Sequence, residues 1–325
     1  MKLPYITNEE VLQKLSMTET ITCTENVYKA KSEGHTAVWP TVFYEFDPGH
    51  ADMDIKSGYL PDMNIFGHKT VAFMEENTKI GLPDLTGLIV VFSSKTGMPL
   101  GLVDGSAVTG MRTGAASAIG AKYLARKDSK KVLIVGTGNQ APYQVAAIMT
   151  VFPKLELIRI ANPVNKKLAE DFVKDIPLKL KENFNINTDN INFEAADDLE
   201  TAVADSDIII TITPARKPFI KKEWVKPGTH FSCIGADMEG KEEIDPEIFK
   251  NAIVYVDDRY HCSKSGEIEI PLKTGTLKSE QIKGEIGDLI LNKTAGRTSD
   301  DDITIFDATG MALLDLAAAN ILLQK

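Results

Sequence analysis

A short apolar strand that runs into a glycine-rich turn constrains this fold more than any other segment. Residues 132–135 read Val-Leu-Ile-Val, and Gly136, Gly138 and Ala141 follow in the spacing G-x-G-x-x-A. The first glycine permits a tight turn, the second admits a pyrophosphate, and the small third residue lets helix and strand pack. The helix start adds N–H donors and a positive dipole end. The predicted dinucleotide-binding residues are Gly136, Thr137, Gly138, Asn139 and Gln140.

The chain after residue 131 alternates between short strands and polar, helix-like segments. Strand-sized apolar runs rich in Ile and Val recur at 132–135, 157–160, 207–213, 231–234 and 253–256. Such runs are typical of parallel strands buried on both faces. The pattern predicts an α/β, doubly wound Rossmann domain over residues 119–304.

The N-terminal region has a different pattern. The segments from Thr7 to Glu10 and from Ser16 to Glu19 fit capping boxes at the starts of two helices. Residues 36–103 contain short β-rich runs separated by turn signals, which predicts a mostly antiparallel sheet. No helix in this region would close the sheet, so we expect the apolar C-terminal helix to return to it.

Composition argues against several functions. The 36 basic and 46 acidic residues leave a net charge of −10, whereas a binder of nucleic-acid phosphates normally has a basic excess. No apolar run reaches the length of a bilayer span, and the N-terminus lacks the apolar core of a signal peptide. The three cysteines are far apart, which supports neither disulfides nor a zinc site. We expect a cytoplasmic protein with no nucleic-acid, membrane or metal partner.

The end of the second Rossmann strand bears on the choice of nucleotide. NAD enzymes commonly place an acid there for the ribose, but this chain has Asn162, followed by Lys166 and Lys167. An amide with nearby cations suits a ribose 2′-phosphate and slightly favours NADPH. Two lysines on a solvated helix turn would look the same, so NAD and NADP both stay open.

Six motifs, in this order, resemble those of the ornithine cyclodeaminase/mu-crystallin family, and together they span nearly the whole chain. They are Gly67–Lys69, Thr96–Pro99, Thr109–Ser117, Gly136–Ala141, Gly235–Glu243 and Phe306–Gly310. The resemblance implies a Rossmann domain inserted into an α+β substrate-binding and dimerisation domain. That second domain would be discontinuous, formed by residues 1–118 and 305–325. It also implies a homodimer or an assembly of dimers.

The resemblance implies roles for three charged residues. Arg112 matches an arginine that binds the substrate carboxylate; with Thr109 as N-cap, it would lie in the first helical turn. Lys69 matches an active-site lysine near the carboxylate, which can stabilise charge or donate a proton. Asp237 follows a strand and matches an aspartate that exchanges the proton of the substrate nitrogen.

The sequence departs from the family at one point. Family members often carry a second carboxylate-binding arginine on an early strand, but no arginine lies between Ala37 and Lys56. We expect Lys56 to replace it, or the substrate to differ, which puts ornithine in doubt. The resemblance implies two further threonines in the candidate site: Thr113, which would contact cofactor phosphate or support the helix, and Thr309, in a segment that would approach the nicotinamide.

The predicted function is an NAD(P)H-dependent oxidoreductase that interconverts a small amino acid and its imino or keto acid, or reduces a cyclic ketimine, by hydride transfer at the α-carbon. One alternative is a redox-neutral lyase of the ornithine cyclodeaminase type, with bound NAD and release of ammonia. The other is a nucleotide-binding structural protein like mu-crystallin, against which the presence of Lys69, Arg112 and Asp237 argues. The two enzymes share every residue named, so the sequence does not separate them.

Overall fold

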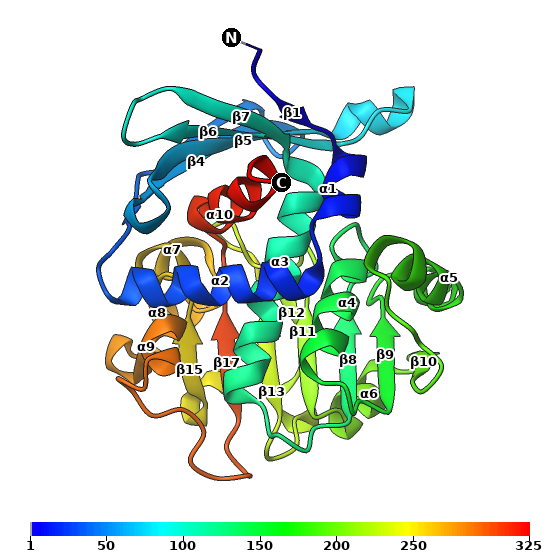
Figure 1. Cartoon of the computed structure of the whole chain (residues 1–325). Helices are drawn as coiled ribbons and strands as arrows, with labels where there is room; N and C mark the ends of the chain where they lie inside the picture. The colour runs from blue at the N-terminus through cyan, green and yellow to red at the C-terminus, as the bar shows by residue number, and fades with distance from the viewer. Residues whose placement is uncertain (1) are drawn as a thin grey trace. The chain divides into compact units, whose positions relative to one another are not determined.

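The computed structural model describes residues 2–325, which form two compact units (Figure 1). Unit 1 contains the chain up to Arg112 together with Met311–Lys325, and unit 2 is Thr113–Gly310. The first division falls inside helix α3 (Gly105–Leu124). Both divisions lie a few residues from the domain limits predicted at 118/119 and 304/305.

Unit 1 begins with the two predicted helices, α1 (Asn8–Lys14) and α2 (Met17–Ser32). Both predicted capping boxes are present: Thr7 and Ser16 each accept a hydrogen bond from the N3 backbone, and the N3 glutamate accepts one from the cap. The reciprocal bonds satisfy backbone donors that a helix start leaves unpaired. Sequence alone therefore located both helix starts.

A seven-stranded sheet forms the rest of unit 1, in the order β1-β7-β6-β5-β4-β2 with β3 paired to β4. All pairs are antiparallel except β1 with β7, as the turn-rich sequence predicted. The strands are β1 (Tyr5–Ile6), β2 (Ala37–Val38), β3 (Val42–Asp47), β4 (Ala51–Leu60), β5 (Ile65–Met74), β6 (Leu85–Ser93) and β7 (Pro99–Asp104).

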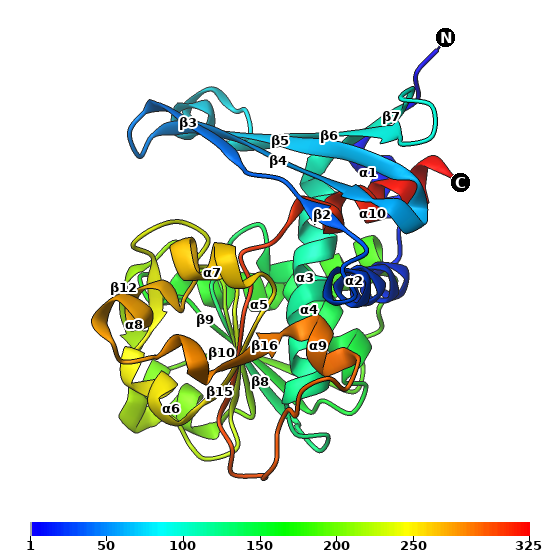
Figure 2. The ribbon, with the colours of Figure 1, turned by 90° about the vertical axis from the view of Figure 1, so that its left-hand side faces the viewer.

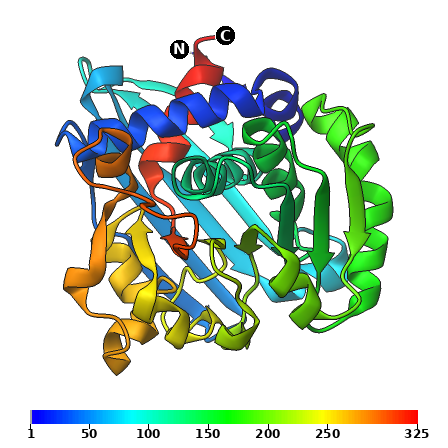
Figure 3. The ribbon, with the colours of Figure 1, turned by 90° about the horizontal axis from the view of Figure 1, so that it is seen from below.

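The C-terminal helix α10 (Ala312–Leu323) returns to unit 1 and packs on one face of this sheet (Figure 2). A Cβ on Gly58 or Gly67 would come within 2.7 Å of Leu313 or 2.8 Å of Leu316, so these glycines make room for α10. Helix α2 packs across α10, as Figure 3 shows from below. The expectation that the last helix closes the N-terminal region is confirmed.

Unit 2 is built on an eight-stranded parallel sheet in the order β10-β9-β8-β11-β13-β17-β15-β16. Helices α4 and α6 both contact β8 and lie on opposite sides of the sheet in Figure 2, the doubly wound arrangement predicted from the sequence. The strands are β8 (Lys131–Val135), β9 (Leu157–Ala161), β10 (Asn192–Ala195), β11 (Ile208–Thr211), β13 (His230–Cys233), β15 (Ile253–Val256), β16 (Ile282–Glu285) and β17 (Thr304–Asp307).

Short elements connect the strands of unit 2. A two-stranded parallel sheet pairs β12 (Arg216–Ile220) with β14 (Glu242–Ile244). The helices are α4 (Ala141–Val151), α5 (Lys166–Phe184), α6 (Leu199–Asp205), α7 (Arg259–Ser265), α8 (Glu269–Thr274) and α9 (Ile286–Ile290). Within residues 2–325, none of the helices is long and apolar enough to cross a bilayer.

Candidate active site

Three elements of unit 1 bring Lys69, Arg112 and Asp315 together. Lys69 lies on β5, Arg112 on α3 and Asp315 on α10, and their exposed fractions are 2%, 7% and 0%. One carboxylate oxygen of Asp315, Oδ1, accepts from Lys69 Nζ at 3.0 Å and from Arg112 Nε at 3.2 Å. The predicted pair of cations therefore meets on a buried carboxylate.

A third cation, Lys56, belongs to the same group. Lys56 on β4 lies directly opposite Lys69 in the antiparallel register, so both side chains are on the same face of the sheet. We call Lys56, Lys69 and Arg112, with Asp315 between them, the cation cluster. Three positive charges against one negative charge leave an excess of positive charge in a mostly buried place, which suits an anionic ligand.

The pKa values in the cation cluster follow from burial and charge. Burial lowers the pKa of Lys69 to about 8; Asp315 opposes this shift, while Arg112 and Lys56 add to it. Burial by itself would raise the pKa of Asp315, but the charges of Arg112 and Lys69 outweigh it and lower that pKa. Asp315 is therefore ionised, and Lys69 gains or loses a proton near neutral pH.

The expected position of Arg112 in its helix is wrong. Helix α3 begins at Gly105, four residues before Thr109, so Arg112 lies well inside the helix and not in its first turn. Thr109 does not cap the helix; its Oγ1 accepts from Lys69 Nζ at 3.2 Å. The free N–H groups at the start of the helix therefore cannot bind the same carboxylate as Arg112.

The glycine-rich turn follows β8 in unit 2 and fits a dinucleotide. Gly136 has a φ of +127°, and a Cβ there would come within 2.5 Å of the Ile212 carbonyl, so only glycine fits. A Cβ on Gly138 would meet nothing within 4 Å, so the space above this residue is open. Ala141 begins α4 and is fully buried. The tight turn, open cradle and small packing residue are the three features that a pyrophosphate site needs.

Asn162 lies at the end of β9 and is bonded to the glycine-rich turn. Its Nδ2 donates to Thr137 Oγ1 at 2.8 Å, and its Oδ1 accepts from the backbone N–H of Val164 and of Asn165, each at 3.0 Å. The amide thus shapes the loop before α5. Lys166 and Lys167, in the first turn of α5, are exposed and ion-paired with Asp197 and Asp171.

Asp237 lies in the loop after β13, at the same carboxyl edge of the sheet as the glycine-rich turn. Its side chain is 48% exposed, and its Oδ1 accepts from Lys241 Nζ at 2.5 Å. A carboxylate exposed at this edge is accessible to a ligand bound there. Lys241, within the same family motif, is the partner of Asp237.

Thr309 follows β17 at the same edge and is almost buried. Its backbone N–H and that of Gly310 both donate to Asp257, at 3.3 and 2.7 Å. Thr113 is also nearly buried, in α3 at the start of unit 2. The structure therefore brings the glycine-rich turn, Asp237 and Thr309 to one edge of the sheet.

Four buried carboxyl groups in unit 2 were not singled out by the sequence as a group. We call them the acid cluster: Asp257, Asp307, Glu243 and Glu267. Each accepts backbone N–H bonds: Glu267 from strand β14, and the other three from segments outside the strands, such as Gly235 N to Glu243 at 3.0 Å and Ile268 N to Asp307 at 3.1 Å. These acids order the loops at the carboxyl edge.

Asp315 was also missed, although the sequence carries a signal for it. It is the one charged residue in the apolar run of α10, Ala312–Leu323. A lone acid in a helix buried on all sides needs a partner, because an unpaired buried charge is very costly. That reasoning would have pointed to a cation on the sheet.

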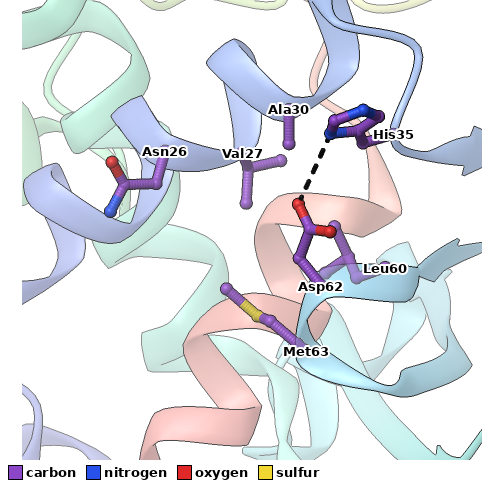
Figure 4. A pocket seen from close by; sticks show the side chains of 7 residues that line it. All are labelled: Asn26, Val27, Ala30, His35, Leu60, Asp62 and Met63. Carbon is purple, nitrogen blue, oxygen red and sulfur yellow. Dashed lines mark ion pairs between the residues drawn. The ribbon is translucent and has the colours of Figure 1, made fainter.

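A separate cavity in unit 1 contains none of the predicted residues (Figure 4). Its volume is about 80 Å³, and His35 and Asp62 face each other across it at 3.9 Å. Among residues 2–325, no group of three or more His, Cys, Asp or Glu side chains is placed to hold a metal ion.

Comparison with known proteins identifies relatives over the full length. A model of the ornithine cyclodeaminase/mu-crystallin family matches residues 4–325, so the resemblance seen in the sequence is confirmed. The chain is 36% identical to alanine dehydrogenase of Archaeoglobus fulgidus, over 100% of this chain and 95% of that protein.

Two solved structures have the same fold. An archaeal alanine dehydrogenase dimer with bound NAD superposes with a TM-score of 0.89 at 35% identity, covering 100% of this chain and 96% of the other. Δ1-Pyrroline-2-carboxylate reductase of Thermococcus litoralis, in complex with NADH and L-proline, gives 0.90 at 30% identity and covers 98% and 96%. Both activities belong to the oxidoreductase class predicted from the sequence.

Proposed function

Because this chain belongs to the ornithine cyclodeaminase/mu-crystallin family, we propose that it is an NAD(P)H-dependent oxidoreductase acting on a small amino acid or its imino or keto acid, or on a cyclic ketimine. The observation that carries the proposal is the cation cluster, where three cations surround one buried carboxylate. A substrate carboxylate would balance the excess positive charge. A carboxylate group is common to all these substrates.

Arg112 and Lys69 bind the substrate carboxylate in this proposal. Arg112 donates to Asp315 through Nε, so its two terminal nitrogens remain for a bidentate contact with the substrate carboxylate. Lys69 donates to Asp315 and Thr109, which leaves one N–H. Lys56 takes the place of the missing early-strand arginine. If Lys56→Ala leaves KM unchanged for every amino and imino acid substrate, that replacement is wrong.

Asp237 handles the proton of the substrate nitrogen. Reduction of an imine adds a hydride to carbon and a proton to nitrogen; bound NAD(P)H supplies the hydride. Asp237 is exposed at the carboxyl edge of the sheet, where a ligand can reach its carboxyl group, and this position supports Asp237 as the group that exchanges the proton. In the oxidative direction the same carboxylate accepts the proton.

The glycine-rich turn holds the nucleotide, with Gly136, Gly138, Thr137, Asn139 and Gln140 around the pyrophosphate. Thr113 supports the adjoining helix or contacts phosphate, and Thr309 borders the nicotinamide. In this proposal residues 119–304 are the nucleotide-binding domain and residues 1–118 with 305–325 the substrate-binding and dimerisation domain.

We infer a preference for NADPH from the absence of an acid at Asn162 and from the two lysines after it. The ion pairs of Lys166 and Lys167 are exposed and therefore weak, so a 2′-phosphate can displace the acids. The double change Lys166→Ala/Lys167→Ala should lower kcat/KM with NADPH and leave that with NADH unchanged. Lys174→Ala, further along α5, is the matched control. Equal loss with both nucleotides would contradict the preference.

The dimer is also part of the proposal. Strand β3 exposes four large apolar side chains, more than a monomer normally leaves in water: Val42, Phe43, Tyr44 and Phe46. A Phe43→Glu variant that stays as dimeric as the wild type in light scattering would exclude this strand from the interface. The three cysteines are buried thiols, which supports a cytoplasmic location; cell fractionation tests it.

One assay separates this function from its alternatives. The protein is incubated with amino acids, with keto acids plus ammonia, and with cyclic imines, while nicotinamide absorbance and ammonia are followed together. Net nucleotide turnover is the expected result. Ammonia from ornithine or lysine without net turnover would identify a lyase, and nucleotide binding without either would identify a structural protein.

A further inference from the structure

Asp315 is a charged residue at a fully buried position, where an unpaired charge would be very costly. The rest of α10 is apolar or uncharged, and its leucines pack on the sheet. Asp315 is fully buried, and Oδ1 takes both cations. Its other oxygen, Oδ2, has no hydrogen-bond partner within residues 2–325. A carboxylate that served packing alone would use both oxygens or be replaced by leucine.

The donor geometry shows what Asp315 does to its neighbours. It occupies one N–H of Lys69, and Thr109 Oγ1 occupies a second, so the direction of the third N–H is set. It accepts from the Nε of Arg112, which fixes the orientation of the guanidinium plane and leaves the two terminal nitrogens without a bond to this carboxylate oxygen. One carboxylate thus orients the donors of two cations.

We propose that Asp315 is a positioning residue, which orients Lys69 and Arg112 and keeps Lys69 charged so that both bind the carboxylate of the substrate. The inference rests on the proposed function for the identity of the ligand. It goes beyond that function by assigning Asp315 an effect exerted only through the two cations.

Charge supports the same assignment. The charges that act on Lys69 most strongly are Asp315 on α10, Arg112 on α3 and Lys56 on β4, and Asp54, two residues before Lys56 on β4, lies on the same face of the sheet. Asp315 is the negative charge bonded to Lys69. Without it, three mostly buried cations would repel one another, and Lys69 would lose its proton more readily. A neutral Lys69 would no longer attract a carboxylate.

The first test is a titration of Lys69 in the protein without substrate. Lysine labelled with ¹³C at Cε gives one NMR signal per residue, and Lys69→Arg identifies that of Lys69. In Asp315→Asn we expect Lys69 to titrate at lower pH than in the wild type. Asn320→Ala, a change at another nearly buried polar position of α10, should leave it unchanged. An unshifted Lys69 in Asp315→Asn would overturn the proposal.

The second test uses the reaction. Asp315→Asn should lower kcat/KM tenfold or more, mainly through a higher KM, and the basic limb of its pH profile should move to lower pH. Asp315→Glu, which keeps the charge, should restore the pH profile but not the full KM. If Asp315→Asn does not fold, Asp315→Glu still tests the role, because a wild-type KM in that variant would show that the geometry of this carboxylate does not position the two cations. Failure of every substrate would refute the proposed function and leave the NMR result standing.

Discussion

Unit 1 and unit 2 each bury a group of ionisable side chains, and the two groups behave in opposite ways. In the cation cluster of unit 1, Asp315 contacts two cations, and its pKa is lowered. In the acid cluster of unit 2, no lysine or arginine of residues 2–325 is ion-paired with the four carboxyls. Burial raises the pKa of Asp307 to about 8 and raises those of Glu243, Glu267 and Asp257.

The difference shows that burial alone does not decide whether a group is charged. Desolvation pushes every buried carboxyl toward its neutral form, and only opposite charges nearby reverse the shift. The acid cluster, protonated in part, holds backbone N–H groups such as those of Thr309 and Gly310. The cation cluster holds Lys69 and Arg112 on one buried carboxylate. The acid cluster orders the backbone, whereas in the proposed function the cation cluster binds the substrate.

The largest expected effect concerns the exposed acid, which belongs to neither cluster. Asp237→Asn should lower kcat by about 10²–10⁴-fold, because a positioned proton donor contributes that much. Steady-state kinetics over a pH range checks it. Glu239→Gln, an exposed acid in the same loop, is the control and should retain wild-type kcat. Undiminished turnover in Asp237→Asn would remove the proton-transfer role.

The next largest effect is expected from a substitution in the cation cluster. Arg112→Met should lower kcat/KM by roughly 10²-fold or more, since removing one partner from a buried ionic contact costs about 3 kcal/mol or more. Arg112→Lys keeps the charge but lacks the planar guanidinium, so its kcat/KM should lie between those of Arg112→Met and the wild type. Kinetics with the best substrate of the panel measures both. A wild-type KM in Arg112→Met would show that the carboxylate binds elsewhere.

A smaller effect is the pH dependence of substrate binding. Lys69 has a pKa of about 8, lowered mainly by burial, so its charged form is lost as pH rises through that value. KM should therefore rise above pH 8, by up to about tenfold in all, because Arg112 stays charged. Lys69→Arg is charged at every accessible pH and should abolish the rise. A rise that persists in Lys69→Arg belongs to another group.

The smallest effect tests the acid cluster. The raised pKa of Asp307 means that the folded state keeps a proton up to about pH 8, whereas the unfolded chain loses it near pH 4. The folded state thus binds more protons over this range, and stability from Asp307 falls as pH rises. Asp307→Asn mimics the neutral acid and should weaken that fall by about 1–3 kcal/mol between pH 5 and 8.

Urea unfolding at several pH values measures this change. Asp315→Asn is the contrasting variant, because its carboxyl has a lowered pKa and contributes stability at high pH. Parallel pH curves for Asp307→Asn and the wild type would show that Asp307 is ionised in the folded protein.

Local chemistry determined what the sequence could predict. The capping pairs Thr7–Glu10 and Ser16–Glu19 and the glycine-rich turn depend on neighbouring residues, and the structure places all three as expected. The start of α3 was misplaced because threonine is a preferred N-cap residue, which made Thr109 the expected cap. The helix instead begins at Gly105, directly after β7.

The sequence did not predict contacts between segments that lie far apart in the chain. Lys69 and Asp315 are 246 positions apart, and only the return of α10 to the sheet brings them together. Family resemblance supplied Lys69 and Arg112 but not the acid between them. The grouping of the four acids was missed for the same reason, since they come from separate loops and strands, although Glu243 and Asp307 lie within motifs seen in the sequence.

The central claim is that the cation cluster binds the carboxylate of the substrate. A crystal structure with NAD⁺ or NADP⁺ and the amino-acid product found in the panel tests it most directly. We expect the carboxylate within hydrogen-bond distance of the terminal nitrogens of Arg112 and of Lys69 Nζ, with Asp315 still bonded to both residues. A carboxylate bound away from Arg112 and Lys69 would contradict it.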